Sequence, residues 1–146
     1  MATTKFELAR EIMLRMLHTP YIWMGNDPMA GFDCSGAVVE VLQSVDILPR
    51  GDWTAEDLRR KFAANHVQVP RPGCLVWWPS QHDSSRAAHI EMVFDVIGSL
   101  IVTWGASGGN KRTTSLAQAI KQDAYIKLRP LRPGWKWAAD PFRQLP

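Results

Sequence analysis

A cysteine that precedes a helical apolar pattern is the first candidate for chemistry in this chain. The segment Gly31-Phe32-Asp33-Cys34-Ser35-Gly36 leads into residues 37–42, which are apolar except for Glu40. Asp33 has the type and position of a residue that caps a helix starting at Cys34. Unpaired backbone N–H groups and the positive end of the helix dipole then favour a thiolate over a thiol. We therefore expect Cys34 to be a nucleophile.

A cysteine nucleophile needs a base within hydrogen-bond reach, and one of the four histidines stands out as that base. His89 begins the predicted strand of residues 89–94, from which its side chain can be aimed at the start of a helix that packs on the sheet. The others lie at a helix end (His18) or in polar, turn-like stretches (His66 and His82). We predict that His89 serves Cys34.

A carboxylate follows this histidine at strand spacing. Glu91 is two residues after His89, so both side chains leave the same face of a strand. Glu91 could orient the imidazole or stabilise its charged form. The alternative is a carboxylate at a partly exposed sheet position, with no part in catalysis.

The elements that must position these residues begin with helices. Thr4-Lys5-Phe6-Glu7 has the form of a capping box, and Pro20 ends the helix that it opens. Apolar side chains inside that helix recur at helical spacing: Phe6, Ala9, Met13 and Met16. Residues 21–33 show no periodicity and predict a loop. Two more helices are predicted over residues 34–45 and 54–64.

The second half of the chain is predicted to form a sheet. Residues 74–78, 88–96, 100–104 and 124–128 have the composition of strands and are separated by turn residues. The first three are close enough for an antiparallel meander, and residues 114–122 could form a short helix. Helices followed by a mostly antiparallel sheet indicate an α+β fold.

Composition excludes several classes of protein. A chain of 146 residues with 46% hydrophobic and 21% charged residues predicts one globular domain, residues 1–146, without a membrane span. Two cysteines do not make a disulfide scaffold, and no CxxC or HExxH spacing predicts a zinc site. Cys74 opens a predicted strand and is expected to be a small buried side chain.

The net charge of +3 is concentrated near the C-terminus. A basic tail that contains Pro and Trp starts at about residue 130, within a wider basic segment of residues 126–146. Its basic residues are Lys127, Arg129, Arg132, Lys136 and Arg143. Such a segment is either a solvated surface or a contact for a polyanion such as an anionic cell wall or nucleic acid.

Four stretches, taken in order, match a known pattern. They are Pro20-Tyr21-Ile22-Trp23-Met24-Gly25, the segment around Cys34, Arg71-Pro72-Gly73-Cys74-Leu75-Val76-Trp77 and Ala88-His89-Ile90-Glu91-Met92-Val93. Together they resemble the NlpC-type cysteine peptidases of bacterial cell walls over roughly residues 8–128. The later stretches Gly105-Ala106-Ser107-Gly108-Gly109-Asn110 and Ala124-Tyr125-Ile126-Lys127-Leu128-Arg129-Pro130 look like phage-associated members of this family.

The resemblance implies a papain-like fold with the helix of the nucleophile packed on a central antiparallel sheet. It also implies hydrolysis of amide bonds in peptidoglycan stem peptides, commonly between D-glutamate and the following diamino acid, without a cofactor or metal. Cys34 matches the nucleophile and His89 the base. Tyr21 matches a tyrosine beside the thiol that helps polarise the scissile carbonyl, or it is simply a buried ring. Asp33 and Ser35 match residues that line the substrate cleft.

One family position differs in this chain. The third catalytic residue is usually a polar side chain on the strand after the base, and alignment places it at or near Trp104. Because indole cannot accept a proton, Glu91, Thr103 or a backbone carbonyl must orient His89, or activity is weakened. We also expect Trp23 and Trp104 to wall the cleft.

Several functional readings follow. The first is a cell-wall endopeptidase, a monomer that binds a stem peptide and neither nucleic acid nor membrane. Because residues 1–10 lack a secretory apolar core, we expect synthesis in the bacterial cytoplasm and delivery to the wall by phage lysis, a phage tail or a secretion machine. The alternatives are a catalytically weak or inactive phage tail or assembly component, an injected interbacterial amidase toxin, and an acyl transferase of related fold.

Overall fold

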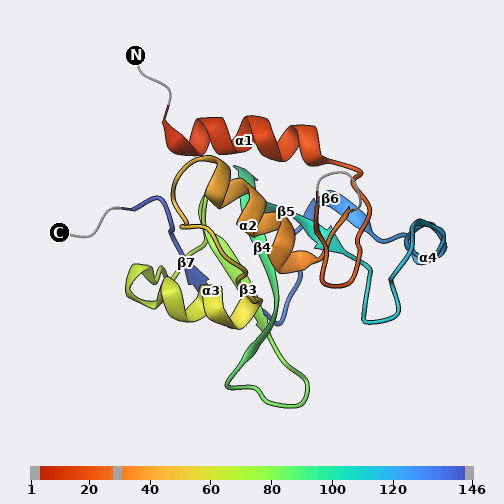
Figure 1. Ribbon diagram of the computed structural model, residues 1–146. Coiled ribbons are helices and arrows are strands. Elements are labelled where there is room, and N and C mark those ends of the chain that lie inside the picture. Colours follow the sequence, from red (N-terminus) through yellow and green to blue (C-terminus); the bar gives the residue numbers. More distant parts are fainter. Residues whose placement is uncertain (1–3, 28–30, 144–146) are drawn as a thin grey trace.

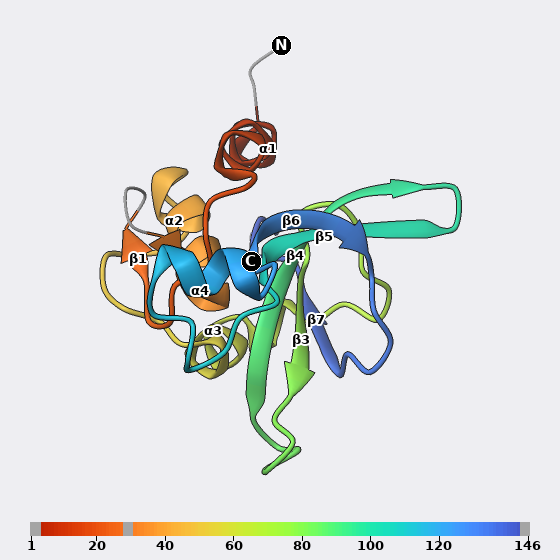
Figure 2. The same cartoon turned by 90° about the vertical axis from the view of Figure 1, so that its right-hand side faces the viewer.

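The computed structural model describes residues 4–27 and 31–143, in which helices cover one side of a five-stranded antiparallel sheet (Figures 1 and 2). The strand order is β6-β5-β4-β3-β7. The strands are β3 (Leu75–Pro79), β4 (Ala87–Ile97), β5 (Leu100–Ser107), β6 (Tyr125–Pro130) and β7 (Trp137–Ala139). The helices are α1 (Lys5–Met16), α2 (Cys34–Ser44), α3 (Ala55–Lys61) and α4 (Leu116–Lys121), with a short 3₁₀ turn at Ala63–Asn65. The predicted α+β fold is confirmed.

Side-chain caps fix where the helices begin. In α1, Thr4 Oγ1 accepts from the Glu7 backbone N–H at 3.1 Å, and Glu7 Oε2 accepts from the Thr4 N–H at 2.8 Å. This is the predicted capping box. Thr54 and Asp57 form a second one at the start of α3. Each box satisfies backbone donors that a helix start leaves unpaired, and so sets the first residue of its helix.

Short strands are the elements that the sequence pattern missed. Within the predicted loop of residues 21–33, β1 (Asn26–Asp27) pairs with β2 (Gly31–Phe32), while residues 28–30 lie outside the described part. β7 pairs with β3 and lies within the segment predicted to be a basic tail. A strand of two or three residues is too short to show an alternation of apolar and polar residues, so the sequence pattern does not reveal it. Such strands form because tertiary contacts bring them beside a partner.

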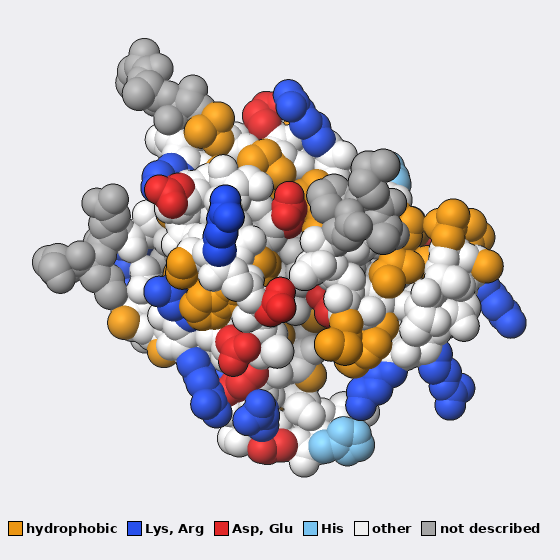
Figure 3. Space-filling view, viewed as in Figure 1, with side chains coloured by type: hydrophobic (Ala, Val, Ile, Leu, Met, Phe, Trp, Pro, Cys, Tyr) orange, Lys and Arg blue, Asp and Glu red, His pale blue; other side chains and the backbone are white. Residues whose placement is uncertain are grey.

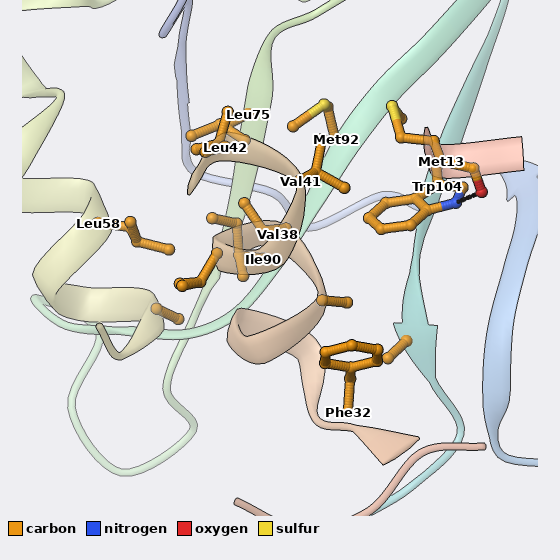
Figure 4. Close-up of a cluster of buried hydrophobic side chains, with 14 of the residues drawn as sticks. Met13, Phe32, Val38, Val41, Leu42, Leu58, Leu75, Ile90, Met92 and Trp104 are labelled. Carbon is orange, nitrogen blue, oxygen red and sulfur yellow. Dashed lines mark hydrogen bonds between the residues drawn. The ribbon is translucent and has the colours of Figure 1, made fainter. Parts of the chain in front are cut away.

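Two layers of apolar side chains hold the sheet. Val38, Val41 and Leu42 of α2 pack against Ile90 and Met92 of β4 on the helical side (Figure 4). On the opposite face a smaller cluster contains Val67, Cys74, Val76, Val93 and Ala138. Neighbouring strand residues thus point to opposite faces. Cys74 is fully buried, as expected from the sequence.

The surface carries both signs of charge, with a hydrophobic area at one end. Orange side chains gather on the right of Figure 3, where Figure 1 places α4, and Leu116 and Ile120 of this helix are exposed. Among the helices of residues 4–27 and 31–143, none combines the length and the apolar character needed to cross a bilayer.

Candidate active site

Cys34 occupies the first position of α2 with a free thiol that is half-buried. Asp33 caps this helix, since its Oδ1 accepts from the Gly36 N–H at 2.7 Å and from the Ser35 hydroxyl at 3.3 Å. Burial raises the pKa of the Asp33 carboxyl, and these hydrogen bonds oppose the rise. The predicted cap is therefore present, and it directs the helix N-terminus and its thiol into the cleft.

His89 lies beside Cys34 in the cleft, and its ring hydrogen-bonds the Glu91 carboxylate. Its Nε2 is 2.6 Å from Glu91 Oε2, which leaves Nδ1 as the ring nitrogen available to the thiol. An irregularity in the β3–β4 register next to His89, of the kind that re-aims side chains, separates the pairs Trp78↔His89 and Pro79↔Ala87. The structure thus brings together the predicted nucleophile, the predicted base and the neighbouring carboxylate.

The pKa of His89 reflects this position. Burial favours the neutral ring, but hydrogen bonds to Cys34 and Glu91 and the negative charges of both outweigh it. Together they raise the pKa of His89 to about 9. At neutral pH the ring of His89 is therefore a charged imidazolium.

Glu91 is one of the most buried charged groups in the described chain, at 1% exposure, and it has four partners. Besides His89, its Oε1 accepts from Thr103 Oγ1 at 2.6 Å. Its Oε2 accepts from Arg129 at 2.6 Å and from Arg132 at 2.8 Å. Burial alone would raise the pKa of Glu91, but these donors and the charge of His89 hold it well below its usual range. The carboxylate is therefore ionised and fixed beside the imidazole.

Gly105 of β5 makes room for this carboxylate. The pair Met92↔Trp104 places Gly105 opposite Glu91 in the antiparallel ladder. A Cβ on Gly105 would lie 2.9 Å from Glu91 Cγ. At the position of Gly105, β5 therefore contributes no side chain, and Glu91 fills the volume that such a side chain would occupy.

Trp104 is not in the cleft, which corrects the expectation that it lines it. Its side chain is fully buried, and its Nε1 donates to the Met13 carbonyl of α1 at 2.8 Å (Figure 4). Thr103 reaches Glu91 from the face of β5 opposite to that of Trp104, because successive strand residues point to opposite faces. The predicted alignment of the third catalytic position with Trp104 thus falls on the face that builds the core.

The remaining predicted residues do line the cleft, which has a volume of about 1120 Å³. They are Tyr21, Trp23, Asp33 and Ser35, together with Cys34 and His89. Burial, followed by the charges of Cys34 and Asp33, raises the pKa of Tyr21. Its phenol therefore stays protonated and can donate a hydrogen bond. Trp23 keeps 36% of its surface exposed and presents an aromatic wall.

Three residues of the site were not predicted. Arg129 and Arg132 were assigned to a basic surface segment, whereas both bind Glu91 and line the cleft. Glu56 of α3 is buried, pairs with Arg59 and Arg60, and accepts from the Ala87 N–H at the start of β4 at 2.8 Å. A carboxylate followed by arginines at helical spacing was a signal for Glu56. Nothing local in the sequence pointed to the two arginines.

The other histidines lie outside the cleft. His18 packs against Tyr125 with the two rings tilted by 35°, His66 forms a backbone β-bridge with Ala139, and His82 is exposed. Within residues 4–27 and 31–143, no group of three His, Cys, Asp or Glu residues is placed to hold a metal ion.

Comparison with solved structures finds the same fold. The NlpC/p60 domain of the peptidoglycan hydrolase SagA matches with a TM-score of 0.60 and 21% identity, over 91% of this chain and 97% of that one. An NlpC/P60 family protein from Bacillus cereus ATCC 10987 matches with a TM-score of 0.68 and 20% identity, over 97% of this chain and 42% of that one. An NLP/P60 family protein similar to a lipoprotein, from Staphylococcus aureus Mu50, matches with a TM-score of 0.52 and 22% identity, over 86% of this chain and 40% of that one. This chain thus spans about two fifths of the latter two proteins.

Among curated proteins no match to this chain was found. The family described as "NlpC/P60 family" matches residues 18–129, a range that includes Cys34, His89, Glu91 and Arg129. On the strength of that match over most of its length, the chain belongs to the NlpC/P60 family.

Proposed function

We propose that this protein is a cysteine peptidase that hydrolyses amide bonds in peptidoglycan stem peptides. The observation that carries the proposal is that Cys34 and His89 line one open cleft and that the His89 ring is hydrogen-bonded to the buried Glu91 carboxylate. A nucleophile, a base and a group that orients the base are the parts that this chemistry requires. The printed description of one structural neighbour, a peptidoglycan hydrolase, supports the substrate class.

The resting enzyme holds its proton on the imidazole. The raised pKa of His89 favours imidazolium next to a Cys34 thiolate, and the start of α2 stabilises the negative sulfur. The thiolate attacks the carbonyl carbon of the scissile amide and forms a tetrahedral intermediate. Its oxyanion accepts hydrogen bonds from the Cys34 backbone N–H and from the protonated phenol of Tyr21.

Collapse of this intermediate breaks the carbon–nitrogen bond. The His89 imidazolium gives its proton to the leaving nitrogen, so an amine departs and a thioester remains on Cys34. Neutral His89 then takes a proton from water, whose oxygen attacks the thioester. The products are a carboxylic acid, which ionises at neutral pH, and the regenerated thiolate beside imidazolium.

Glu91 has two roles in this cycle. Its bond to Nε2 fixes the ring so that Nδ1 faces the sulfur, and its charge stabilises the imidazolium. Thr103, Arg129 and Arg132 hold the carboxylate in place. An inactive assembly component was the alternative, because Trp104 cannot orient His89. Glu91 supplies that function, so the enzymatic reading is favoured.

The experiment compares Cys34→Ala with the matched variant Cys74→Ala on purified peptidoglycan. Mass spectrometry of the soluble products reports which bond is cut, and whether water or another amine accepts the acyl group. We expect new amino and carboxyl groups with the wild type and Cys74→Ala, provided that circular dichroism shows both variants folded. Undiminished release by Cys34→Ala would refute the assignment of the nucleophile.

We also propose that a phage lysis or tail apparatus delivers the enzyme to the wall, from the resemblance of residues 105–110 and 124–130 to phage-associated members. Expression in a bacterial cytoplasm, alone or with a phage pore-forming protein, tests this route. Lysis only with the pore supports delivery from the cytoplasm, whereas lysis without it argues against the need for such a partner.

A further inference from the structure

The cluster of arginines beside the catalytic series carries more positive charge than the series needs. Among the described residues, Glu91 is the one carboxylate that both arginines contact. Arg129 and Arg132 thus share a single carboxylate at this end of the cleft, so their two positive charges exceed its one negative charge. An excess cation next to a substrate cleft is a binding site for an anion.

Arg132 is the more exposed of the two arginines that line the cleft. Its side chain is 43% exposed, compared with 24% for Arg129. Of its guanidinium nitrogens, only NH2 has a hydrogen-bond partner among the described residues, the Glu91 carboxylate. The other guanidinium donors are left for a ligand. Since arginine presents its donors as a planar fork, it can bind a carboxylate through two parallel hydrogen bonds.

The orientation of Arg132 is fixed in advance. Its guanidinium carbon lies 4.9 Å from the centre of the Trp78 ring, and Trp78 Nε1 donates to the Pro133 carbonyl at 3.2 Å. The same indole lies 5.3 Å from the His89 ring, centre to centre. A cation that is held between an aromatic face and a carboxylate loses little freedom when it binds an anion.

The position of Arg132 relative to His89 tells which part of the substrate it meets. Arg132 and His89 share one oxygen of Glu91, so Arg132 lies beyond the imidazole as seen from Cys34. His89 must reach the leaving nitrogen to protonate it. The residue that departs as the amine therefore extends toward Arg132.

We infer that Arg132, supported by Arg129, binds a free carboxylate on the leaving-group residue of the substrate. This inference rests on the proposed function, and it defines the substrate class as stem peptides in which the departing residue carries an ionised carboxyl group. Amidation of that carboxyl group removes the charge and one acceptor oxygen, so the amide is a poorer ligand.

The test measures binding separately from hydrolysis. Cys34→Ala protein is titrated by calorimetry with two synthetic γ-D-glutamyl-diamino acid peptides that differ only in whether the carboxyl group that is free on the leaving residue of a stem peptide is ionised or amidated. We expect the free acid to bind about 10- to 100-fold more tightly, as a charge-assisted pair allows. Added Arg132→Gln should abolish the preference, and Arg132→Lys should keep part of it.

Arg112→Gln is the matched control, because it removes one positive charge at an exposed position outside the cleft lining. It should keep the full preference for the acid. Equal affinity for acid and amide in protein with Arg132 intact, or no binding of either peptide, would overturn the inference. If the acid binds preferentially but the wild type hydrolyses neither peptide, the carboxylate site stands and the proposed hydrolysis of this bond fails.

Discussion

Glu91 Oε2 lies 2.6 Å from His89 Nε2, and both residues belong to β4, two positions apart. The base and the group that orients it are therefore carried by the same strand. In most arrangements of this kind the third residue comes from a separate element. Here the position opposite Glu91 on β5 is Gly105, and the orienting group is built into β4. Spacing along one strand therefore sets the geometry of the pair.

This relationship predicts the effect of Glu91→Gln. The amide keeps the size of the side chain but removes the charge that stabilises imidazolium and pairs with Arg129 and Arg132. We expect kcat/KM to fall about 100-fold, as for other losses of a positioned acid–base partner, with a lower melting temperature. Steady-state kinetics and thermal unfolding measure both effects. Unchanged turnover in a folded protein would remove Glu91 from the mechanism.

The raised pKa of His89 predicts the alkaline limit of activity. The active form needs a protonated imidazole, and that proton is held up to a pKa of about 9. We therefore expect kcat/KM to persist above neutral pH and to decline as the pH rises through about 9. In Glu91→Gln the limit should move to lower pH, because a raising influence is lost. An alkaline limit near the ordinary histidine pKa of about 6.5 in the wild type would contradict the ion pair.

Gly105→Ala tests whether the space opposite Glu91 is needed. The new Cβ would lie 2.9 Å from Glu91 Cγ, so the carboxylate must move away from His89. We expect a large loss of kcat and a destabilisation of about 1–3 kcal/mol, as for overpacking. The comparison is Gly98→Ala, where a Cβ meets nothing within 4 Å but the backbone φ of +63° strains an alanine. Gly98→Ala should lower stability and keep activity. The comparison therefore separates a displacement of the Glu91 carboxylate from a general loss of stability.

Glu56 predicts an acid-sensitive contribution to stability. Hydrogen bonds from Arg59 outweigh burial and, with those from Ala87 and Arg60, lower the pKa of Glu56 from 4.5 to about 2. Because the folded pKa is the lower one, this stabilisation is complete above pH 4.5 and is lost as the pH falls toward about 2. Glu56→Gln should cost about 2 kcal/mol at neutral pH and reduce the acid sensitivity of unfolding. Chemical denaturation across this pH range measures it, with the exposed Glu11→Gln as control.

The sequence predicted the parts of the site that depend on local pattern. Asp33 and Cys34 were identified because a helix cap and a helix start leave a short signature, and His89 and Glu91 because they share one strand. Arg129 and Arg132 could not be found in this way, since their partner Glu91 is 38 and 41 residues away. Their contact exists only because β5 lies between β4 and β6 in the sheet.

Trp104 was misplaced for a related reason: strand alternation fixes which neighbours share a face, but not which face looks toward the cleft. This difference predicts opposite effects for two tryptophans. Trp104→Phe leaves the buried Met13 carbonyl without its donor and reduces core volume, so we expect a loss of about 1–3 kcal/mol of stability and an unchanged KM. Trp23→Ala removes a partly exposed wall of the cleft, so KM should rise several-fold with little change in stability. Denaturant unfolding and steady-state kinetics on the same preparations give both quantities. A raised KM in Trp104→Phe with normal stability would return Trp104 to the cleft.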